Sequence, residues 1–371
     1  MTIDNQLAQI IAQFDFPGAL AGCEAIKTGH INRTYRLRFD QPDGTAREYV
    51  LQRINTFAFK KPREVMHNVA LVTEHLRAAM ERQGIDPQNR VLTLVPAKDG
   101  GALYEDESGS WRAYDFITHA HTVDRVDSPA QFREIGRAFG QFQNMLSDFP
   151  IGELYDTIPD FHDTVKRLQT FERSVAADAA GRVHEVGPEI AFVRARREAM
   201  GRVVRMIEAG ELPLRVTHND TKINNVMLDE NTGAALCVID LDTVMAGSVL
   251  YDFGDAIRYG ASTAAEDERD LSKVRVDMDL FTAYAEGFIS QTARGLTEAE
   301  LLNLPLGALV MTFENGMRFL TDYLDGDVYF HIEKPDDNLA RARCQFRLLE
   351  DMEAHVGEMD ESVRELVGKY R

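Results

Sequence analysis

His218, Asp220 and Asn225 stand in the segment HNDTKINN with the spacing H-x-D-x-x-x-x-N. A carboxylate at the third position can orient an attacking hydroxyl and accept its proton, and an amide oxygen five residues later can bind a hard cation such as Mg²⁺. Phosphoryl transfer needs both functions close together. The same residue types also form ordinary turns in which Asx side chains bind their own backbone, so the spacing needs support from its surroundings.

The support comes from the residues that follow this loop. The runs NVMLD and AALCVIDLD, joined by the turn Asp229–Gly233, predict a β-hairpin that leads into Asp240. In kinases a carboxylate at this place is the second metal ligand. We therefore predict that Asp220 is the catalytic base and that Asn225 and Asp240 bind the metal. Strand alternation would put Asp242 on the same face as Asp240, so Asp242 is an alternative ligand.

Two further residues are predicted to support this loop. His218 precedes the proposed base by two positions, and we expect it to hold the loop by hydrogen bonds rather than to act as a base itself. Asp252 lies in the downstream segment GSVLYDFGDAIR. We expect its carboxylate to accept backbone N–H groups of the catalytic loop.

The first predicted hairpin contains the segment GHINRTY, where a kinase folds a loop over the ATP phosphates. We predict nucleotide contacts at Gly29, Asn32 and Thr34. The segment has one glycine, so an ordinary turn is the alternative interpretation. Phe116 and Ile117 stand where the two predicted lobes join, and we expect them to contact the adenine.

The strand YVLQR lacks the lysine that kinases offer to the α and β phosphates. Arg53 is the nearest cation and could bind phosphate oxygens with two hydrogen bonds, oriented by Glu64 or Asn68 of the next helix. The alternative is that Arg53 is an exposed strand residue.

The elements predicted around these residues form two lobes. Residues 5–14 and 62–82 have helical periodicity, and alternating runs around the turn at Asp43 and Gly44, together with residues 91–97, 101–106 and 111–117, predict an antiparallel sheet. After residue 128 the pattern is mainly helical, including 298–324 and 338–356. We predict an α+β, bilobal, protein-kinase-like fold with a nucleotide-binding lobe at 1–118 and a larger, mainly helical catalytic and substrate-binding lobe at 119–371.

The composition narrows the class of protein. The chain has 371 residues, of which 44% are hydrophobic, and a net charge of −19, which argues against binding to nucleic acid or to anionic membranes. Three widely separated cysteines match no metal-site spacing. The N-terminus carries acids where a signal peptide needs bases, and no apolar run approaches a membrane span, so we expect a cytoplasmic protein. We expect a monomer.

The chain resembles the aminoglycoside phosphotransferase superfamily, which includes choline, homoserine and methylthioribose kinases, and within it the bacterial N-acetylhexosamine 1-kinases. The matching segments are GHINRTY, VLQRIN, YDFI, THNDTKINNVMLD, IDLDTVMAGSVLYDFGDAIR and ENGMRFLTDYLDGDVYF, and they span residues 29–330. The resemblance implies ATP as co-substrate, one or two Mg²⁺ ions and the anomeric hydroxyl of an N-acetylhexosamine as acceptor. It implies sugar contacts at His30, Arg318 and Tyr329, beside Asp220, and Phe330 stands where an aromatic platform for the sugar is expected.

Two alternatives remain at this point. The acceptor could instead be an amino alcohol or an aminoglycoside, although a cationic Arg318 would repel a polyamine. The missing strand lysine would also suit a pseudokinase that binds nucleotide without catalysis, but the intact set of Asp220, Asn225 and Asp240 favours an enzyme.

Overall fold

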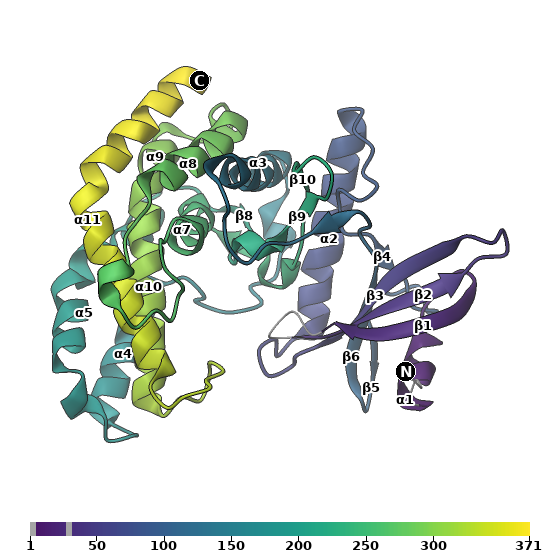
Figure 1. Cartoon of the computed structure of the whole chain (residues 1–371), viewed down its shortest axis with the longest axis horizontal. Coiled ribbons are helices and arrows are strands. Elements are labelled where there is room, and N and C mark those ends of the chain that lie inside the picture. Colours follow the sequence, from purple (N-terminus) through teal and green to yellow (C-terminus); the bar gives the residue numbers. More distant parts are fainter. Residues whose placement is uncertain (1–4, 27–31) are drawn as a thin grey trace.

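The computed structural model describes residues 5–26 and 32–371, and an antiparallel sheet forms one end of the molecule while helices form the other (Figure 1). Within the described residues six strands pair in the order β1-β2-β3-β6-β4, with β5 also paired to β6. The strands of this sheet are β1 (Ala19–Ile26), β2 (Arg33–Asp40), β3 (Ala46–Ile54), β4 (Leu94–Val95), β5 (Tyr104–Asp106) and β6 (Gly109–Asp115). The predicted hairpin is confirmed, because Asp40 pairs with Ala46 across the turn that contains Gly44.

A helix packs on each face of this sheet. Helix α1 (Asn5–Ile11) places Ile10 and Ile11 in one apolar cluster with Leu37 and Leu51. Helix α2 (Pro62–Arg82) contributes a buried stripe to a second cluster, on the other side, and lies between the sheet and the helical half (Figure 1). Successive residues of β3 therefore point either toward α1 or toward α2.

The second half consists mainly of helices. They are α3 (Pro129–Met145), α4 (Thr164–Ala177), α5 (Gly187–Met200), α6 (Arg202–Glu208), α7 (Val249–Gly260), α8 (Met278–Thr292), α9 (Glu298–Leu302), α10 (Leu304–Asp325) and α11 (Asp337–Tyr370). Its short strands are β7 (Ala120–His121), β8 (Arg215–Thr217), β9 (Val226–Asp229), β10 (Ala235–Val238) and β11 (Met245–Gly247). Strand β7 pairs with β9, so the chain enters this half directly after β6.

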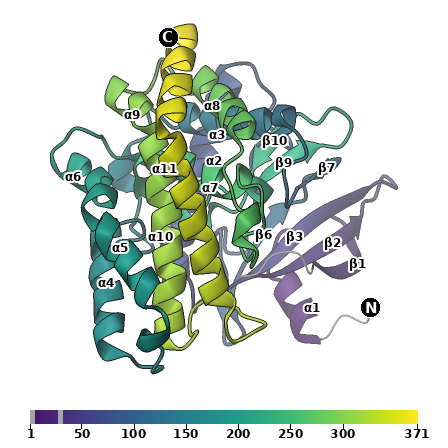
Figure 2. The same ribbon diagram turned by 60° about the vertical axis from the view of Figure 1, so that its left-hand side comes forward.

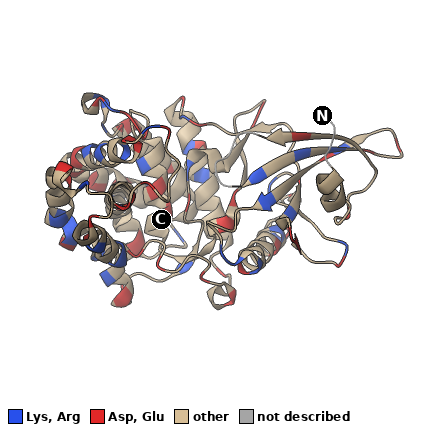
Figure 3. Cartoon of the chain, turned by 90° about the horizontal axis from the view of Figure 1, so that it is seen from below, with Lys and Arg blue, Asp and Glu red and all other residues tan. Residues whose placement is uncertain are grey.

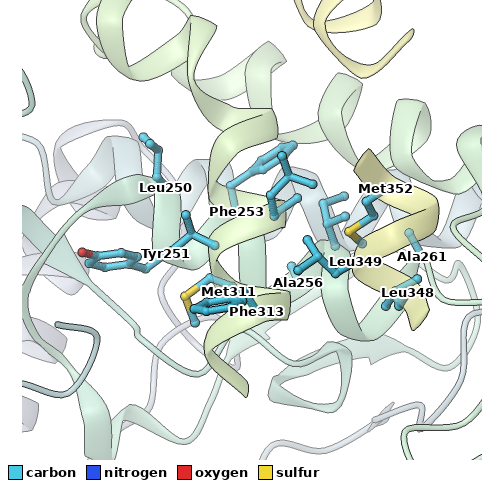
Figure 4. Packing of buried hydrophobic residues seen from close by; sticks show 14 of the residues in the cluster. Leu250, Tyr251, Phe253, Ala256, Ala261, Met311, Phe313, Leu348, Leu349 and Met352 are labelled. Atoms are coloured by element: carbon cyan, nitrogen blue, oxygen red, sulfur yellow. The ribbon is translucent and has the colours of Figure 1, made fainter. Parts of the chain in front are cut away.

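The largest apolar cluster lies in this half, and α7 is at its centre. Helices α10 and α11 run side by side (Figure 2). Phe253 of α7 packs against the rings of Phe281, Tyr284 and Phe288 of α8, and Leu250 of α7 approaches α10 (Figure 4). Gly254 of α7 and Gly307 of α10 permit this close approach. A Cβ at Gly254 would lie 2.2 Å from the backbone oxygen of Gly307, and a Cβ at Gly307 would lie 2.2 Å from that of Leu250. This close packing fixes the position of α7 and therefore of the loop that precedes it.

The α+β fold that the sequence predicted is confirmed, with differences in the bounds of several elements. The predicted strand at 91–97 is only the short β4, the predicted helix at 298–324 divides into α9 and α10, and the last helix extends to Tyr370. The division of the second-last helix has a local cause, because Pro305 lacks the N–H that a continuous helix would need and stands in the first turn of α10.

Charged residues of both signs alternate over the ribbon rather than forming one acidic or basic face (Figure 3). In the described ranges 5–26 and 32–371, no helix is long and apolar enough to cross a membrane. Cys23, Cys237 and Cys344 are free thiols, and burial raises the pKa of Cys237 to about 12.

Candidate active site

The loop between β8 and β9 carries Asp220, and Asp240 comes into its vicinity two residues after the end of β10. The 3₁₀ turn Ile223–Asn225 ends the loop, and the backbone N–H of Ile239 donates to the oxygen of Asn225 at 2.9 Å. The short β9–β10 hairpin therefore folds back so that the two predicted metal ligands are adjacent. Its turn is the predicted one, since Gly233 has a φ of 70° and its N–H donates to the oxygen of Asp229.

His218 and Asp252 hold this loop from two sides. Nε2 of His218 lies 2.9 Å from the oxygen of Ile239, and its Nδ1 accepts the N–H of Asp220 at 3.3 Å. This pairing requires the tautomer with the proton on Nε2. Asp252 accepts the backbone N–H groups of His218 and Asn219 at 2.8 and 2.7 Å, and burial raises its pKa to about 6. Both side chains make the loop contacts that a supporting role requires.

Lys222 lies beside the proposed base, and the sequence analysis did not single it out. Its Nζ is 3.0 Å from Oδ1 of Asp220. Burial tends to raise the pKa of Asp220, but the charge and hydrogen bond of Lys222, together with the charges of His218 and Arg258, hold that pKa below its ordinary value. The carboxylate is therefore ionised at neutral pH, as a proton acceptor must be. Lys222 follows Asp220 by two positions, so its place in the motif could have predicted this pairing from the sequence.

Asn225 and Asp240 offer oxygen atoms to a divalent cation. Nδ2 of Asn225 donates to the backbone oxygen of Asp220 at 2.8 Å, so its amide oxygen is the atom left for a ligand. Asp240 is exposed on the surface of the site, but desolvation by the surrounding protein, and then the nearby carboxylates of Asp242 and Asp220, raise its pKa to about 6. Mg²⁺ is commonly held by one or two protein oxygens together with substrate phosphates, and this pair fits that description. A cation would also relieve the repulsion among the three carboxylates.

Asp242, the alternative ligand, is engaged elsewhere. Its Oδ2 accepts from Nδ2 of Asn32 at 2.8 Å, and its Oδ1 is paired with the buried guanidinium of Arg112. Both oxygens therefore face the sheet in this structure, which leaves Asp240 as the aspartate of this segment that is open to a metal.

The residues predicted for the nucleotide lie on or near the sheet. Asn32 accepts the N–H of Asn55 at 2.9 Å, and the hydroxyl of Thr34 accepts from Gln52 at 3.1 Å. Arg53 stands opposite Trp111 on the face of β3 that looks toward α1, whereas Gln52 looks toward α2. The predicted clamp by Arg53 is thus on the opposite face of the sheet from α2. Gly29 lies outside the described residues.

The two residues of the α2 helix that were considered as partners of Arg53 also point elsewhere. Glu64 pairs with Lys61, and Asn68 donates to the backbone oxygens of Tyr155 and Val244 at 2.8 and 2.9 Å. Asn68 therefore ties α2 to the segment after the metal-binding strand.

Phe116 and Ile117 do lie at the junction between the two halves. The N–H of Phe116 donates to the oxygen of Glu48 at 3.0 Å, and Arg36 stacks on its ring. Ile117 is buried in the cluster that contains α2. The amide of Phe116 is already paired, so an adenine at this junction would contact other backbone atoms of the segment.

Arg318 and Tyr329, two of the acceptor residues that the resemblance implied, lie near the partly buried Arg167. Burial and the charge of Arg318 hold the pKa of Arg167 below its ordinary value. The hydroxyl of Tyr329 acts on the pKa of the same guanidinium in the opposite direction. The Arg318 guanidinium lies 5.3 and 5.6 Å from the ring centroids of Phe161 and Phe330. Arg167 was not found from the sequence, because nothing in its helix distinguishes it from a surface arginine. His30 lies outside the described residues.

A hydrogen-bonded path joins helix α10 to the catalytic loop. His162 contacts the backbone oxygen of Asn219 at 3.1 Å and Oε1 of Glu314 at 2.8 Å. Glu314 is fully buried and also accepts from Thr164 at 2.7 Å. Arg318 follows Glu314 by one turn of α10, so the helix holds this guanidinium beside the loop that carries Asp220.

A sequence model of the phosphotransferase enzyme family (APH) matches residues 22–286, which include the catalytic loop, the metal-binding strand and most of the sheet. This chain belongs to that family. It is a small-molecule phosphotransferase that depends on ATP.

Solved structures share its fold at low identity. A microcompartment-associated aminopropanol kinase has a TM-score of 0.61 and 18% identity, over 96% of this chain and 99% of its own. An amicoumacin kinase bound to AMP-PNP, Ca²⁺ and its acceptor gives 0.59 and 13%, over 93% of each chain. A choline kinase from Cryptosporidium parvum gives 0.58 and 13%, over 98% of this chain and 99% of its own.

Proposed function

We propose that this phosphotransferase transfers the γ-phosphate of ATP to the anomeric hydroxyl of N-acetylglucosamine or N-acetylgalactosamine, forming the sugar 1-phosphate. The observation that carries the proposal is the cationic group of Arg318 and Arg167 beside the catalytic loop. Guanidinium groups donate hydrogen bonds to sugar hydroxyls and to an acetamido oxygen, whereas they repel an ammonium group. The segments that resemble the N-acetylhexosamine 1-kinases, including ENGMRFLTDYLDGDVYF, support the same acceptor.

In this proposal Asp220 orients the anomeric hydroxyl and receives its proton as the oxygen attacks the γ-phosphorus. The bond to the leaving ADP oxygen breaks in the same displacement. Lys222 keeps Asp220 ionised and contributes positive charge near the transferred group. Because phosphoryl transfer requires little covalent help from the protein, most of the rate enhancement would come from positioning and charge stabilisation.

Asn225 and Asp240 would hold Mg²⁺, which would neutralise charge on the phosphates when it is bound. His218 and Asp252 keep the ligand-bearing loop in place through the backbone contacts described above. Arg318 and Tyr329 would bind the sugar, and His30 is proposed as a third contact. Gly29, Asn32, Thr34 and the Phe116–Ile117 junction would surround the nucleotide.

A second candidate keeps the fold and changes the acceptor to an amino alcohol or an aminoglycoside. It is favoured by the structural similarity to kinases of aminopropanol and choline. It is disfavoured by the guanidinium pair, since Glu314, the buried acid of that region, is already bonded to His162 and Thr164. A cationic acceptor would then lack a free partner in this group of residues.

The test is to incubate the purified protein with Mg·ATP and one acceptor at a time: N-acetylglucosamine, N-acetylgalactosamine, glucose, choline or kanamycin. ADP release measures turnover, and ³¹P NMR locates the new phosphate. We expect an anomeric phosphate on an N-acetylhexosamine. Turnover only with choline or kanamycin would overturn the sugar proposal in favour of the second candidate.

Two controls make the assignment specific. The methyl glycoside of N-acetylglucosamine lacks the anomeric hydroxyl, so it must not be phosphorylated if that oxygen is the acceptor. Asp220→Asn should lower kcat by about 10²–10⁴-fold while Mg·AMP-PNP still binds. Near wild-type turnover by this variant would show that another group is the base.

A further inference from the structure

Arg112 of β6 and Asp242, 130 residues later in the chain, form a buried ion pair between the sheet and the catalytic half. Their side chains are 2% and 3% exposed. Nε of Arg112 donates to Oε1 of Gln52 at 3.0 Å. Since an unpaired charge at such a site would be costly, each partner depends on the other for its place.

The carboxylate of Asp242 also holds the edge of the sheet where the phosphates are expected. Its second oxygen accepts from Asn32 at 2.8 Å, and Asn32 in turn accepts the N–H of Asn55 at 2.9 Å. One carboxylate therefore binds the start of β2 directly, the end of β3 through Asn32, and the middle of β6 through Arg112.

The same carboxylate is closely linked to the proposed metal ligand. Asp240 has a φ of 60°, and the 3₁₀ turn Leu241–Thr243 follows it at once. A non-glycine residue in this left-handed conformation is kept there by its surroundings. The next residues are fixed by the pair with Arg112 and by the bond from Asn68 to Val244. A displacement of Asp242 would thus displace Asp240 as well.

On the face of β3 that looks toward α2 the chain has Gln52 rather than a lysine. The cation beside it on this face is Arg112 of the adjacent strand β6. Gln52 and Arg112 are directly opposed across the two strands, so they share this face. We propose that the Arg112–Asp242 pair is the positioning element that joins the sheet to the metal-binding segment, so that the affinity for Mg·nucleotide depends on it. Both are positioning residues, because they act through Asp240 and Asn32. This inference rests on the proposed nucleotide and metal site.

The decisive variant removes both charges at once. Arg112→Gln with Asp242→Asn leaves no unpaired buried charge, so the double variant should fold, whereas either single variant would leave one. We expect its Kd for Mg·AMP-PNP, measured by calorimetry, to rise about 10–100-fold, the usual effect of losing a partner that orients a metal ligand. The KM for the acceptor should change less than this Kd, because within the described residues no hydrogen bond or ion pair joins Arg112 or Asp242 directly to Arg318.

A matched control is the pair Arg215–Glu300, in which Glu300 is buried and Arg215 is 16% exposed, and which joins β8 to α9. Arg215→Gln with Glu300→Gln should lower the melting temperature without changing the Kd for Mg·AMP-PNP. The single variant Arg112→Lys keeps the positive charge beside Asp242, so its affinity for Mg·AMP-PNP should lie between those of the double variant and the wild type. Raising the Mg²⁺ concentration should also recover affinity in the double variant, because a misplaced Asp240 weakens the metal site in particular.

The outcomes are distinguishable. If the folded double variant and Arg112→Lys bind Mg·AMP-PNP as the wild type does, the positioning role is wrong while the proposed function stands. An affinity loss that no Mg²⁺ concentration reduces would also overturn it, since that result would place Arg112 on the phosphates themselves. If the wild-type protein fails to bind Mg·AMP-PNP, the proposed nucleotide site fails, and this inference with it.

Discussion

Nζ of Lys222 lies 3.0 Å from Oδ1 of Asp220, so the proposed base carries its own counterion two residues away. Burial acts to raise the pKa of Asp220, and the charge and hydrogen bond of Lys222 act to lower it. The acid–base properties of the site therefore depend on a residue that does not itself accept the proton.

Lys222→Met should move the acid limb of the pH profile of kcat/KM to higher pH. Without the ammonium, burial would raise the pKa of Asp220, so a larger share of the base would be protonated and inactive at a given acidic pH. Initial rates from pH 5 to 9 at saturating Mg²⁺ would measure the shift. Lys222→Arg keeps the charge and should show little shift, and an unchanged limb in Lys222→Met would contradict the role assigned to this lysine.

Asp240→Asn should raise the Mg²⁺ concentration needed for half-maximal activity. It should also lower kcat/KM, which corresponds to a loss of several kcal/mol of transition-state stabilisation. Asn225→Ala should do the same to a smaller extent, because it removes a neutral ligand. Mg²⁺ titrations at fixed ATP provide the measurement. A variant with normal Mg²⁺ dependence would remove the substituted residue from the ligand set.

Glu314→Gln should reduce stability at neutral pH by about 3–5 kcal/mol, the usual result of breaking a buried pair. Burial tends to raise the pKa of Glu314, but His162, Arg167 and Arg318 together hold it below 4.5, its ordinary value. The unfolded chain thus binds a proton more readily than the folded protein does. The stability that the ionised form contributes is present above about pH 4.5 and is lost as the pH falls through the lower folded-state pKa.

Urea denaturation of both proteins from pH 7 down to pH 3 tests this dependence. The gap in unfolding free energy between the wild type and Glu314→Gln should narrow as the pH falls. A gap that stays constant over that range would mean that the ionisation of Glu314 contributes little.

Gly307→Ala should destabilise the catalytic half by about 1–3 kcal/mol or more, because the new methyl group would overlap the backbone oxygen of Leu250. Thermal denaturation measures the loss. Gly357→Ala is the matched control, since a Cβ at that helical glycine meets nothing within 4 Å and should improve helix propensity. Equal melting temperatures for the two variants would show that α7 and α10 can separate at little cost.

Much of the local structure was readable from the sequence. Period-two alternation around Asp43 and Gly44 predicted the β2–β3 hairpin, and the turn Asp229–Gly233 predicted the hairpin that carries Asp240. Helix α2 has the predicted bounds, Pro62–Arg82. These features depend on neighbours a few residues apart, so short patterns determine them.

The sequence by itself determined the order along the chain of the proposed base, the proposed amide ligand and the proposed acid ligand, each a short distance from the last. Lys222 belongs to the same motif, but the other cations near these residues were decided by the tertiary structure. The sequence left Arg53 as either a phosphate ligand or an exposed strand residue. Strand register places it opposite Trp111, on the α1 face, and the fold puts Arg112 against Asp242. Pairings between residues more than a hundred positions apart follow from how sheets and helices pack, and no local spacing encodes them.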